Sequence, residues 1–421
     1  MKTVSFYTLG CKVNSYDTAY MRQLFLQNGY TAVDFGQPAE ITVVNTCTVT
    51  AVADKKSRAA IRRAAKHSKV IVAGCMAQKQ AQELLSWDEV DAVIGTDERS
   101  AIVDISERLL AGEANINATH GLKGCGYEPM SLSEPGERTR GVIKIQEGCD
   151  NFCSYCIIPY VRGRSRSRSL SSILDEAKSL AQSGVKELVL TGIHIASYSD
   201  GSKGLGDVIS KLGGLKGVRV RLGSIEPGVL GEDFIRQAAE TENLCPHFHL
   251  SLQSGSGSVL RRMNRKYTPE EYFRFTELLR KFFDKPAITT DIIAGFPGET
   301  PDEHRETMDF VEKIGFSRLH VFPFSPREGT KAYDMQPKVP KHIARQRADK
   351  LIALGKACEE KYALSLIGLK AQVLFEDESD AYPGCLEGYS ERYVRVAASA
   401  RPGELKAVTL KGVKGTVIYG V

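Results

Sequence analysis

Residues 148–156 read Gly148-Cys149-Asp150-Asn151-Phe152-Cys153-Ser154-Tyr155-Cys156, so three cysteines stand four and three residues apart in one short loop. Thiolates are the soft ligands of iron–sulfur clusters, and a cubane cluster has four irons. Because the loop supplies three thiolates, one iron would stay open to a small molecule. A structural zinc site is the alternative, but zinc takes four ligands, often including histidine, and no His occurs between Met130 and Ile193. The loop therefore predicts an iron–sulfur centre on Cys149, Cys153 and Cys156.

The residues around this loop predict an open (β/α)6 barrel. A strand over 141–146 delivers the cysteine loop, and five further strand-like runs alternate with helical patterns after it. The further strands are expected at 187–190, 218–222, 247–252, 287–293 and 318–322. The helices are expected at 172–183, 205–212, 231–240, 269–283 and 302–314. Active-site residues of such barrels lie at the carboxyl ends of the strands.

Polar side chains follow the expected strands where the barrel rim would lie. They are Thr191, His194, Ser224, Glu226, Ser251, Gln253 and Asp291. We select Gln253 and Asp291 as contacts to a cofactor or substrate, with ordinary hydrogen bonds within the rim as the alternative. His194 is left unassigned, because packing within its loop is the simpler explanation.

The first 112 residues predict a mostly parallel α/β sheet, because short strands alternate with helical patterns over short links. The strands are expected at 4–9, 41–45, 70–73 and 92–94. The helices are expected at 15–27, 51–67, 78–85 and 99–110.

Three cysteines occupy equivalent positions in this alternation, each just after a strand and before a helix: Cys11, Cys47 and Cys75. Parallel strands bring their carboxyl ends to one edge of the sheet, so these residues should converge. We expect a second three-thiolate metal site there. The alternative is three ordinary buried cysteines, since Cys packs like a small hydrophobic residue.

An arginine run follows the cysteine loop, with Arg162, Arg164, Arg166 and Arg168 inside seven residues that include no acid. Beside an active site such a run suits an RNA backbone or a SAM carboxylate, although a solvated loop has the same composition. We predict RNA contacts at Arg162 and Arg164.

The C-terminal residues predict a small all-β barrel, because five short strands with Gly and Pro turns follow position 368. Small barrels often bind RNA through exposed basic and aromatic side chains. Arg392 and Arg395 are the predicted RNA contacts. Further candidates are Tyr389, Tyr393, Lys411 and Lys414. The expected domains are 1–112, a linker 113–140, 141–338, a connecting helix 339–368, and 369–421.

Composition favours a cytoplasmic globular protein. Of 421 residues 42% are hydrophobic and 25% charged, and no apolar run approaches the ~20 residues of a membrane span. The first residues read as a strand and not as a secretion signal. Ten cysteines in this context indicate metal binding in a reducing compartment and not disulfides. The net charge of +5 is compatible with a nucleic-acid partner.

Four motifs together resemble the radical S-adenosylmethionine (SAM) methylthiotransferases over essentially the whole chain. They are Thr8-Leu9-Gly10-Cys11-Lys12-Val13-Asn14, Asn45-Thr46-Cys47-Thr48-Val49, Gly74-Cys75-Met76-Ala77-Gln78 and the 148–156 loop, and the C-terminal end resembles a TRAM domain. The resemblance implies two [4Fe-4S] clusters, one on each cysteine triplet, with SAM on the open iron at Cys149, Cys153 and Cys156 and Tyr155 beside its adenine. One SAM would yield a 5′-deoxyadenosyl radical that takes hydrogen from an aromatic C–H, the other cluster would provide sulfur, and a second SAM would provide the methyl group.

Finer details resemble the bacterial branch of the family that acts on N6-threonylcarbamoyladenosine at position 37 of tRNA. They are Gly10-Cys11-Lys12-Val13-Asn14, Lys144-Ile145-Gln146-Glu147-Gly148-Cys149 and Leu190-Thr191-Gly192-Ile193-His194. The implied partners are the tRNA anticodon stem-loop, an electron donor such as flavodoxin or ferredoxin, and a sulfur donor. Alternative substrates are isopentenyladenosine in tRNA and an aspartate of a ribosomal protein. An iron–sulfur electron-transfer or RNA-binding protein without catalysis is the non-enzyme alternative.

Overall fold

The computed structural model describes residues 2–133, 139–228 and 231–421, and the chain divides into two compact units. The first unit comprises Met1–Gly136, Lys144–Ser172 and Ser325–Tyr333. The second unit comprises Glu137–Ile143, Ile173–Phe324 and Asp334–Val421. Strand β7 (Arg140–Glu147) begins in the second unit and ends in the first, so the cysteine loop that follows it belongs to the first unit.

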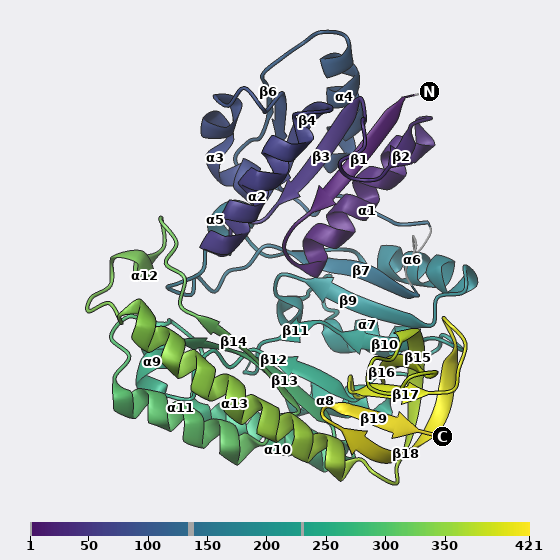
Figure 1. The fold of residues 1–421 in the computed structure, drawn as a ribbon, viewed down its shortest axis with the longest axis vertical. Helices are drawn as coiled ribbons and strands as arrows, with labels where there is room; N and C mark the ends of the chain where they lie inside the picture. The colour runs from purple at the N-terminus through teal and green to yellow at the C-terminus, as the bar shows by residue number, and fades with distance from the viewer. Residues whose placement is uncertain (1, 134–138, 229–230) are drawn as a thin grey trace. The chain divides into compact units, whose positions relative to one another are not determined.

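The first unit is built on a six-stranded sheet in the order β2-β1-β3-β4-β5-β6, with all neighbours parallel (Figure 1). Its strands are β1 (Thr3–Thr8), β2 (Thr31–Val33), β3 (Ile41–Thr46), β4 (Lys69–Gly74), β5 (Ala92–Ile94) and β6 (Ile116–Ala118). Its helices are α1 (Lys12–Gln27), α2 (Ala51–Ala64), α3 (Cys75–Leu85), the 3-10 turn η1 (Arg99–Ala101) and α4 (Ile102–Leu110). The parallel α/β sheet predicted from the alternation is confirmed.

Alternating side chains of this sheet fill two separate cores. On one face Val43 and Ile71 pack with Phe25 of α1 and Ile105 of α4. On the other face the strand residues pack with helices α2 and α3, and this core includes Val44, Val72, Ile61 and Leu84. When helices cover both faces of a sheet, its strands have almost continuous apolar sequences. This pattern made β3 and β4 recognisable in the sequence.

The structure differs from the sequence prediction at two places in this unit. Residues 116–118 form β6 and pair with β5, although 113–140 was expected to be a linker. Helix α1 begins at Lys12 and not at position 15, because Cys11 is its N-cap residue and the chain turns into the helix directly after the strand.

The remainder of the first unit surrounds the cysteine loop. After the loop come helix α5 (Ile158–Arg162) and strand β8 (Arg166–Ser167). Strand β8 pairs antiparallel with the end of β7, through Gln146↔Ser167 and Glu147↔Arg166.

The second unit contains most of the predicted barrel. Its strands are β9 (Glu187–Gly192), β10 (Arg219–Leu222), β11 (Ser224–Ile225), β12 (His247–Leu250), β13 (Ala287–Ala294) and β14 (Arg318–Pro323). They lie in two sheets of order β10-β9-β7-β8 and β11-β12-β13-β14, and every neighbouring pair from β11 to β14 is parallel. The strands follow one another in chain order, as the open (β/α)6 architecture predicts.

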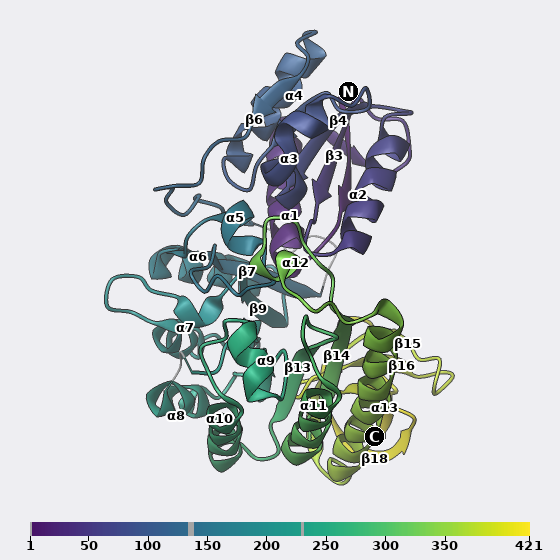
Figure 2. The ribbon, with the colours of Figure 1, turned by 90° about the vertical axis from the view of Figure 1, so that its left-hand side faces the viewer.

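Helices cover these strands, and Figure 2 shows α10, α11 and α13 side by side next to β13 and β14. The helices of this unit are α6 (Leu170–Gln182), α7 (Leu205–Leu212), α8 (Glu232–Glu240), α9 (Gly257–Arg262), α10 (Pro269–Phe282), α11 (Pro301–Ile314) and α13 (Lys341–Ser365), with a 3-10 turn η2 (Ile195–Ser197). The short helix α12 (Lys331–Asp334) belongs to the first unit except for its last residue. Helices α10 and α11 both begin with a Thr-Pro pair, and in each the Thr and the Glu three residues later form a capping box. Within the described residues, no helix is both long and apolar enough to cross a membrane.

The C-terminal strands close into a barrel of order β15-β16-β17-β19-β18 (yellow-green to yellow in Figure 1). They are β15 (Lys370–Glu378), β16 (Leu386–Ser390), β17 (Arg395–Ala398), β18 (Leu405–Lys414) and β19 (Val417–Gly420). Its core includes Val373, Phe375, Val396 and Ile418, together with Leu366 just after α13. The small barrel predicted from five short strands is confirmed.

Candidate functional site

The first cysteine set lies at the carboxyl edge of the six-stranded sheet. The register pairs Thr8 with Asn45 and Thr46 with Gly74, so the ends of β1, β3 and β4 are adjacent. Cys11, Cys47 and Cys75 directly follow these ends. The structure therefore places all three predicted residues at one edge, where side chains of parallel strands meet.

Cys11, Cys47 and Cys75 lie close to one another, as the tight packing at Gly10 and the pKa of the Cys47 thiol indicate. A side-chain carbon added to Gly10, whose φ is +109°, would lie 2.9 Å from Cys47 Cβ and 3.2 Å from its Sγ. Glycine is therefore required at this turn. Burial raises the pKa of the Cys47 thiol to about 11, and the neighbouring Cys75 and Cys11 contribute to the rise. Cys47 and Cys75 are buried, whereas Cys11 is exposed.

Two asparagines brace the turns that carry this set. Asn14 Nδ2 donates to the carbonyl oxygens of Leu9 at 2.7 Å and Thr46 at 2.9 Å. Asn45 Nδ2 donates in turn to the Asn14 carbonyl oxygen at 3.0 Å. The backbone around Cys11 is thereby tied to the backbone around Cys47.

The second cysteine set lies in a loop that the backbone holds closely. Gly148 has φ +69°, and a side-chain carbon there would lie 2.0 Å from the carbonyl oxygen of Arg164. The Cys149 N–H donates to the Gly163 carbonyl oxygen at 3.1 Å, and the Asn151 N–H points to Cys149 Sγ at 3.5 Å. Cys153 is buried, and Cys149 and Cys156 are partly exposed.

The two sets are neighbours within the first unit. Cys75 shares a small buried apolar cluster with Ile157 and Val161 of the segment that directly follows Cys156. The Thr96 hydroxyl, at the end of the next strand of the sheet, donates to the Val161 carbonyl oxygen at 2.6 Å. Spatial proximity of the two triplets was not part of the sequence prediction.

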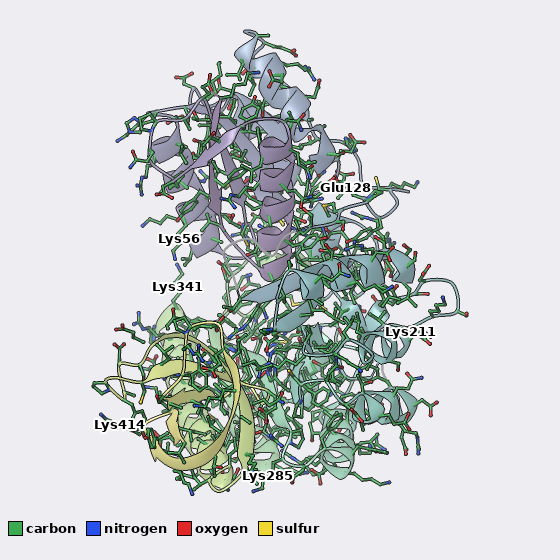
Figure 3. All side chains as sticks on the ribbon, turned by 90° about the vertical axis from the view of Figure 1, so that its right-hand side faces the viewer. Lys56, Glu128, Lys211, Lys285, Lys341 and Lys414 are labelled. Atoms are coloured by element: carbon green, nitrogen blue, oxygen red, sulfur yellow. The ribbon has the colours of Figure 1, made fainter. Side chains whose placement is uncertain are left out.

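A buried network of ion pairs lies beside both sets and was missed by the sequence analysis. Its cations are Arg99, Lys144 and Arg162, and its carboxylates are Asp17, Glu128 (labelled in Figure 3) and Glu147. Lys144 Nζ lies 2.8 Å from Asp17 Oδ1, and Arg162 Nη1 lies 2.9 Å from both Glu147 oxygens. Burial alone would raise the pKa of the Glu147 carboxyl, but Arg162, Lys144 and Arg99 hold that pKa well below its usual range. One signal was present in the sequence: Lys144 and Glu147 are charged residues in a strand whose other members include the apolar Val142, Ile143 and Ile145.

Arg162 has surroundings different from those expected of an RNA contact. Its side chain is wholly buried, and its Nε donates to Cys75 Sγ at 3.3 Å. Burial raises the pKa of the Cys75 thiol, whereas Arg162 opposes that rise. A guanidinium enclosed in this way presents no surface to an RNA backbone, so its placement gives the predicted contact no support. Arg164 is 70% exposed and pairs with Asp150 at 3.2 Å.

Both triplets suit a cubane cluster by the chemistry of their donors. Each offers three thiols and leaves one iron for a small molecule. Among the described residues, no group of three or more His, Cys, Asp or Glu side chains is arranged around a single metal ion. A cubane binds its cysteines through different irons, so its ligands stand farther apart than those of a single ion.

The second unit brings several of the predicted rim residues together. The Gln253 N–H donates to the Asp291 carbonyl oxygen at 2.9 Å, and Gln253 has φ +69°. The Asp291 carboxylate lies 3.2 Å from His249 Nε2. The hydroxyls of Ser224 and Ser251 lie 2.7 Å apart. The main chain of Gln253 is held at this φ by its bonds to strand β13, since the Ile293 N–H also donates to the Gln253 carbonyl oxygen at 2.9 Å.

A charged group also lies at this rim, and it includes a residue that the sequence analysis missed. Arg265 Nη2 lies 3.2 Å from Glu226 Oε2, and His194 Nε2 lies 3.6 Å from the same oxygen. Arg265 was missed because it belongs to the turn after α9, which was not predicted.

The predicted RNA contacts of the small barrel divide into two groups. Arg392 donates to the carbonyl oxygens of Lys285 at 3.2 Å and Asp284 at 3.1 Å, so it is engaged within the second unit. Tyr389 and Tyr393 stack on one another with ring centroids 4.5 Å apart. Arg395 is partly exposed and pairs with Glu387 at 3.2 Å. Lys411 and Lys414 are exposed.

Two arginines of β10 bond the small barrel through its main chain. Arg219 donates to the carbonyl oxygens of Gln372 at 2.6 Å and Tyr389 at 2.8 Å. Arg221 donates to those of Ser390 and Glu391, each at 2.9 Å. Glu187 accepts from both arginines, at 2.6 and 2.8 Å.

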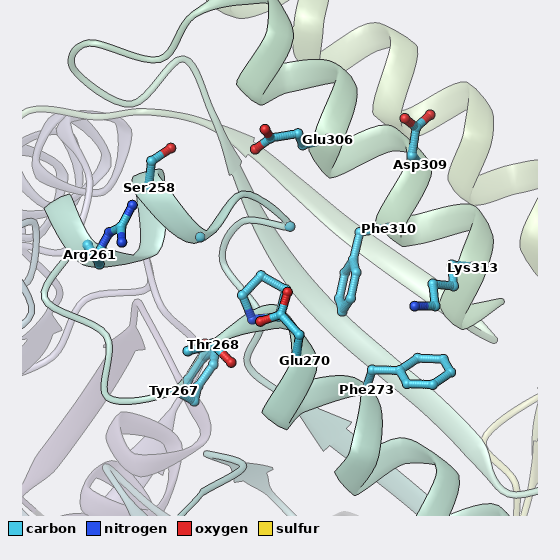
Figure 4. Close-up of a pocket in the computed structure, with 13 residues that line it drawn as sticks. Ser258, Arg261, Tyr267, Thr268, Glu270, Phe273, Glu306, Asp309, Phe310 and Lys313 are labelled. Atoms are coloured by element: carbon cyan, nitrogen blue, oxygen red, sulfur yellow. The ribbon is translucent and has the colours of Figure 1, made fainter.

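A cavity of about 690 Å³ opens between α9, α10 and α11 (Figure 4). Its wall carries both charges, and Lys313 lies over the Phe273 ring at 4.1 Å. Its described lining residues include neither Gln253, nor Asp291, nor a cysteine. None of the predicted cofactor or metal contacts therefore lies among the described lining residues of this cavity.

Comparisons with known proteins agree with this geometry. Residues 143–311 match the radical SAM superfamily, and residues 3–95 match an uncharacterized protein family designated UPF0004. The structure of the radical S-adenosylmethionine methyltransferase TsrM from Kitasatospora setae, with cobalamin and a [4Fe-4S] cluster bound, is similar in fold. Its TM-score is 0.58 at 14% identity, over 77% of this chain and 74% of that chain.

Several curated relatives match almost the whole chain. Threonylcarbamoyladenosine tRNA methylthiotransferase MtaB of Bacillus subtilis (strain 168) is 38% identical over 94% of this chain and 90% of its own length. MtaB of Thermotoga maritima is 37% identical over 98% of this chain and 95% of its own length. The tRNA-2-methylthio-N(6)-dimethylallyladenosine synthase of Oceanobacillus iheyensis is 33% identical over 91% of this chain and 76% of its own length.

The fold, the cysteine loop and the matched superfamily define a radical SAM enzyme, whose cofactors are SAM and [4Fe-4S] clusters. Within that class, the chain belongs to the tRNA methylthiotransferase family. The family predicted from the sequence motifs is confirmed.

Proposed function

We propose that this methylthiotransferase converts N6-threonylcarbamoyladenosine at position 37 of tRNA into its 2-methylthio derivative. The observation that carries the proposal is the pair of three-cysteine sets, which are neighbours within one compact unit through Cys75 and Ile157. Methylthiolation needs one centre that makes a radical and another that supplies sulfur, because neither side chains nor SAM can insert a sulfur atom. The choice of substrate rests on similarity to MtaB proteins, of which that of Bacillus subtilis is 38% identical.

Each part of the chain has a role in this proposal. Cys149, Cys153 and Cys156 hold the cluster that binds SAM, and Cys11, Cys47 and Cys75 hold the cluster that provides sulfur. When bound, the clusters and two SAM molecules supply the radical, the sulfur and the methyl group. By resemblance to the family, Tyr155 would contact the SAM adenine; Gln253 and Asp291, on the rim of the second unit, would offer polar contacts to SAM. Arg164, Arg395, Lys411 and Lys414 contact the anticodon stem-loop.

The protein acts in the cytoplasm, where a reductant such as flavodoxin or ferredoxin and a sulfur donor are at hand. Ten cysteines in a chain of this length suit metal binding in a reducing compartment.

Mass spectrometry of tRNA nucleosides tests the proposal. A strain that lacks the gene should lose 2-methylthio-N6-threonylcarbamoyladenosine and accumulate the unmodified N6-threonylcarbamoyladenosine. The wild-type gene should restore the product, whereas Cys149→Ala should not. If the level of this nucleoside is unchanged and 2-methylthio-isopentenyladenosine is lost, the substrate is isopentenyladenosine in tRNA. If both nucleosides are unchanged, a ribosomal-protein aspartate becomes the substrate to test.

A second measurement tests the chemistry independently of the substrate. Purified enzyme with SAM and a strong reductant should form 5′-deoxyadenosine, and substrate tRNA should increase the rate. Absence of this product from cluster-loaded protein, with and without tRNA, would contradict the assigned role of the 149–156 cysteines.

A further inference from the structure

The geometry points to Arg162 as a positioning residue that bonds the sulfur-providing cysteine set to the SAM-binding loop and raises the reduction potential of the cluster on Cys11, Cys47 and Cys75. The inference rests on the proposed assignment of that set as a cluster site. It concerns one side chain that belongs to neither triplet.

All three nitrogens of the Arg162 guanidinium donate hydrogen bonds to neighbouring side chains. Its Nε donates to Cys75 Sγ at 3.3 Å, and its Nη1 donates to both Glu147 oxygens at 2.9 Å. Its Nη2 donates to Asn14 Oδ1 and lies 3.4 Å from Asp17 Oδ2. A guanidinium has five N–H donors in a rigid plane, so these partners fix its orientation.

The partners of Arg162 lead to both cysteine sets. Asn14 braces the turns at Cys11 and Cys47 through the carbonyl oxygens of Leu9 and Thr46. Glu147 Oε1 accepts from the Gly148 N–H at 3.2 Å, immediately before Cys149. Gly163, which follows Arg162, accepts from the Cys149 N–H at 3.1 Å. Arg162 therefore contacts Cys75 directly. It is connected to the turns at Cys11 and Cys47 through Asn14, and to the Cys149 loop through Glu147.

The charge of Arg162 acts on the cluster as well as on the fold. The network holds three cations and three carboxylates, so it is neutral before any thiolate is counted. Hydrogen bonds to ligand sulfurs and nearby positive charge raise the reduction potential of an iron–sulfur cluster. Because Arg162 is wholly buried, water screens its charge little.

Arg99 provides a matched control within the same network. It is also buried and pairs with Asp17 at 2.9 Å and Glu128 at 2.7 Å. Its described hydrogen bonds go to carboxylates and not to a cysteine. A purely structural role for the network predicts similar consequences for Arg162→Lys and Arg99→Lys.

The test is a redox titration of the full chain, followed by electron paramagnetic resonance. Cys149→Ala, Cys153→Ala and Cys156→Ala together isolate the signal of the other cluster, and the reconstituted holoenzyme is titrated in parallel. We expect Arg162→Gln to lower the midpoint potential by about 59 mV or more, which is a tenfold change in a one-electron equilibrium. Arg162→Lys should give a smaller shift in the same direction, and Arg99→Lys should leave the potential unchanged.

An unchanged potential in Arg162→Gln, or equal shifts in Arg162→Lys and Arg99→Lys, would overturn the inference. If Arg162→Gln does not retain iron, Arg162→Lys decides, because it keeps the charge and loses the forked contact. A different measurement, the iron content of the triple-cysteine variant, shows whether the proposed function itself fails. If the triple-cysteine variant with Arg162 intact binds no iron, then Cys11, Cys47 and Cys75 hold no cluster and the assignment of that set fails before Arg162 is tested.

Discussion

Cys75 and Ile157 pack in the same buried apolar cluster, and Ile157 is the residue after Cys156. This contact joins two cysteine triplets that lie in different sequence motifs. If each triplet holds a cluster as proposed, the two clusters lie near one another within the first unit, and an iron count shows whether both form.

Iron content is the first prediction. Reconstituted wild-type protein should bind about eight irons, as expected for two cubanes, and Cys47→Ala with Cys75→Ala should reduce this to about four. Cys385→Ala serves as the control, because Cys385 lies in the small barrel outside both sets, and it should bind iron as the wild type does. Four irons in the wild type, unchanged by the double substitution, would disprove a second cluster.

SAM affinity is the second prediction. Asp291→Ala should raise KM for SAM about tenfold, because hydrogen bonds to charged groups contribute about 1.5–3 kcal/mol. The assay is the initial rate of 5′-deoxyadenosine formation as SAM is varied. Asp309→Ala, in the cavity between α9, α10 and α11, should leave KM unchanged. Equal KM values for both variants would remove Asp291 from the proposed site.

The salt dependence of tRNA binding is the third prediction. Lys411→Ala and Lys414→Ala should each reduce the slope of log affinity against log salt by about one, as expected for one phosphate contact. Figure 3 labels Lys414 on the small barrel and Lys211 on α7. Lys211→Ala is the control, because Lys211 is exposed but carries no predicted RNA contact. Three identical slopes would remove the barrel lysines from the RNA interface.

Stability of the second unit is the fourth prediction. Glu187→Gln should lower the free energy of unfolding by about 3 kcal/mol at pH 7, because it leaves Arg219 and Arg221 buried without their carboxylate. Burial alone would raise the pKa of Glu187, but Arg221, Arg219 and Arg140 lower it to about 2 from 4.5. The contribution is therefore complete above about pH 4.5 and is lost as the pH falls towards 2.

Denaturant unfolding at several pH values checks this prediction. The wild type should lose stability below pH 4.5, and Glu187→Gln should show a smaller loss over the same range. Glu242→Gln, an exposed carboxylate, should behave as the wild type does. A wild-type pH profile in Glu187→Gln would show that this carboxylate does not stabilise the unit.

The sequence predicted the fold because most elements carry a clear local signal. Apolar runs such as β3 and β4 are buried on both faces, and the Thr-Pro starts of α10 and α11 are strong helix signals. Strand β6 escaped notice because it has three residues, of which Ile116 alone is buried.

Whether a single charged residue is buried or exposed could not be predicted from the sequence in the same way. The run from Arg162 to Arg168 has the composition of a solvated loop, yet Arg162 ends α5 and is buried, while Arg164 is exposed. Neighbouring residues of one run receive opposite environments because helix α5 packs against Cys75 through Val161. Such contacts depend on tertiary structure and leave no periodic pattern in the sequence.

The bonds from Arg219 and Arg221 to the small barrel all end on main-chain carbonyl oxygens. Every amino acid carries that acceptor, so the identity of the side chains at 372 and 389–391 is not fixed by these bonds. Evolution can therefore exchange side chains along the barrel without loosening its attachment. Related chains could therefore differ in the outer side chains of the barrel while the hydrogen bonds that attach it to β10 stay the same.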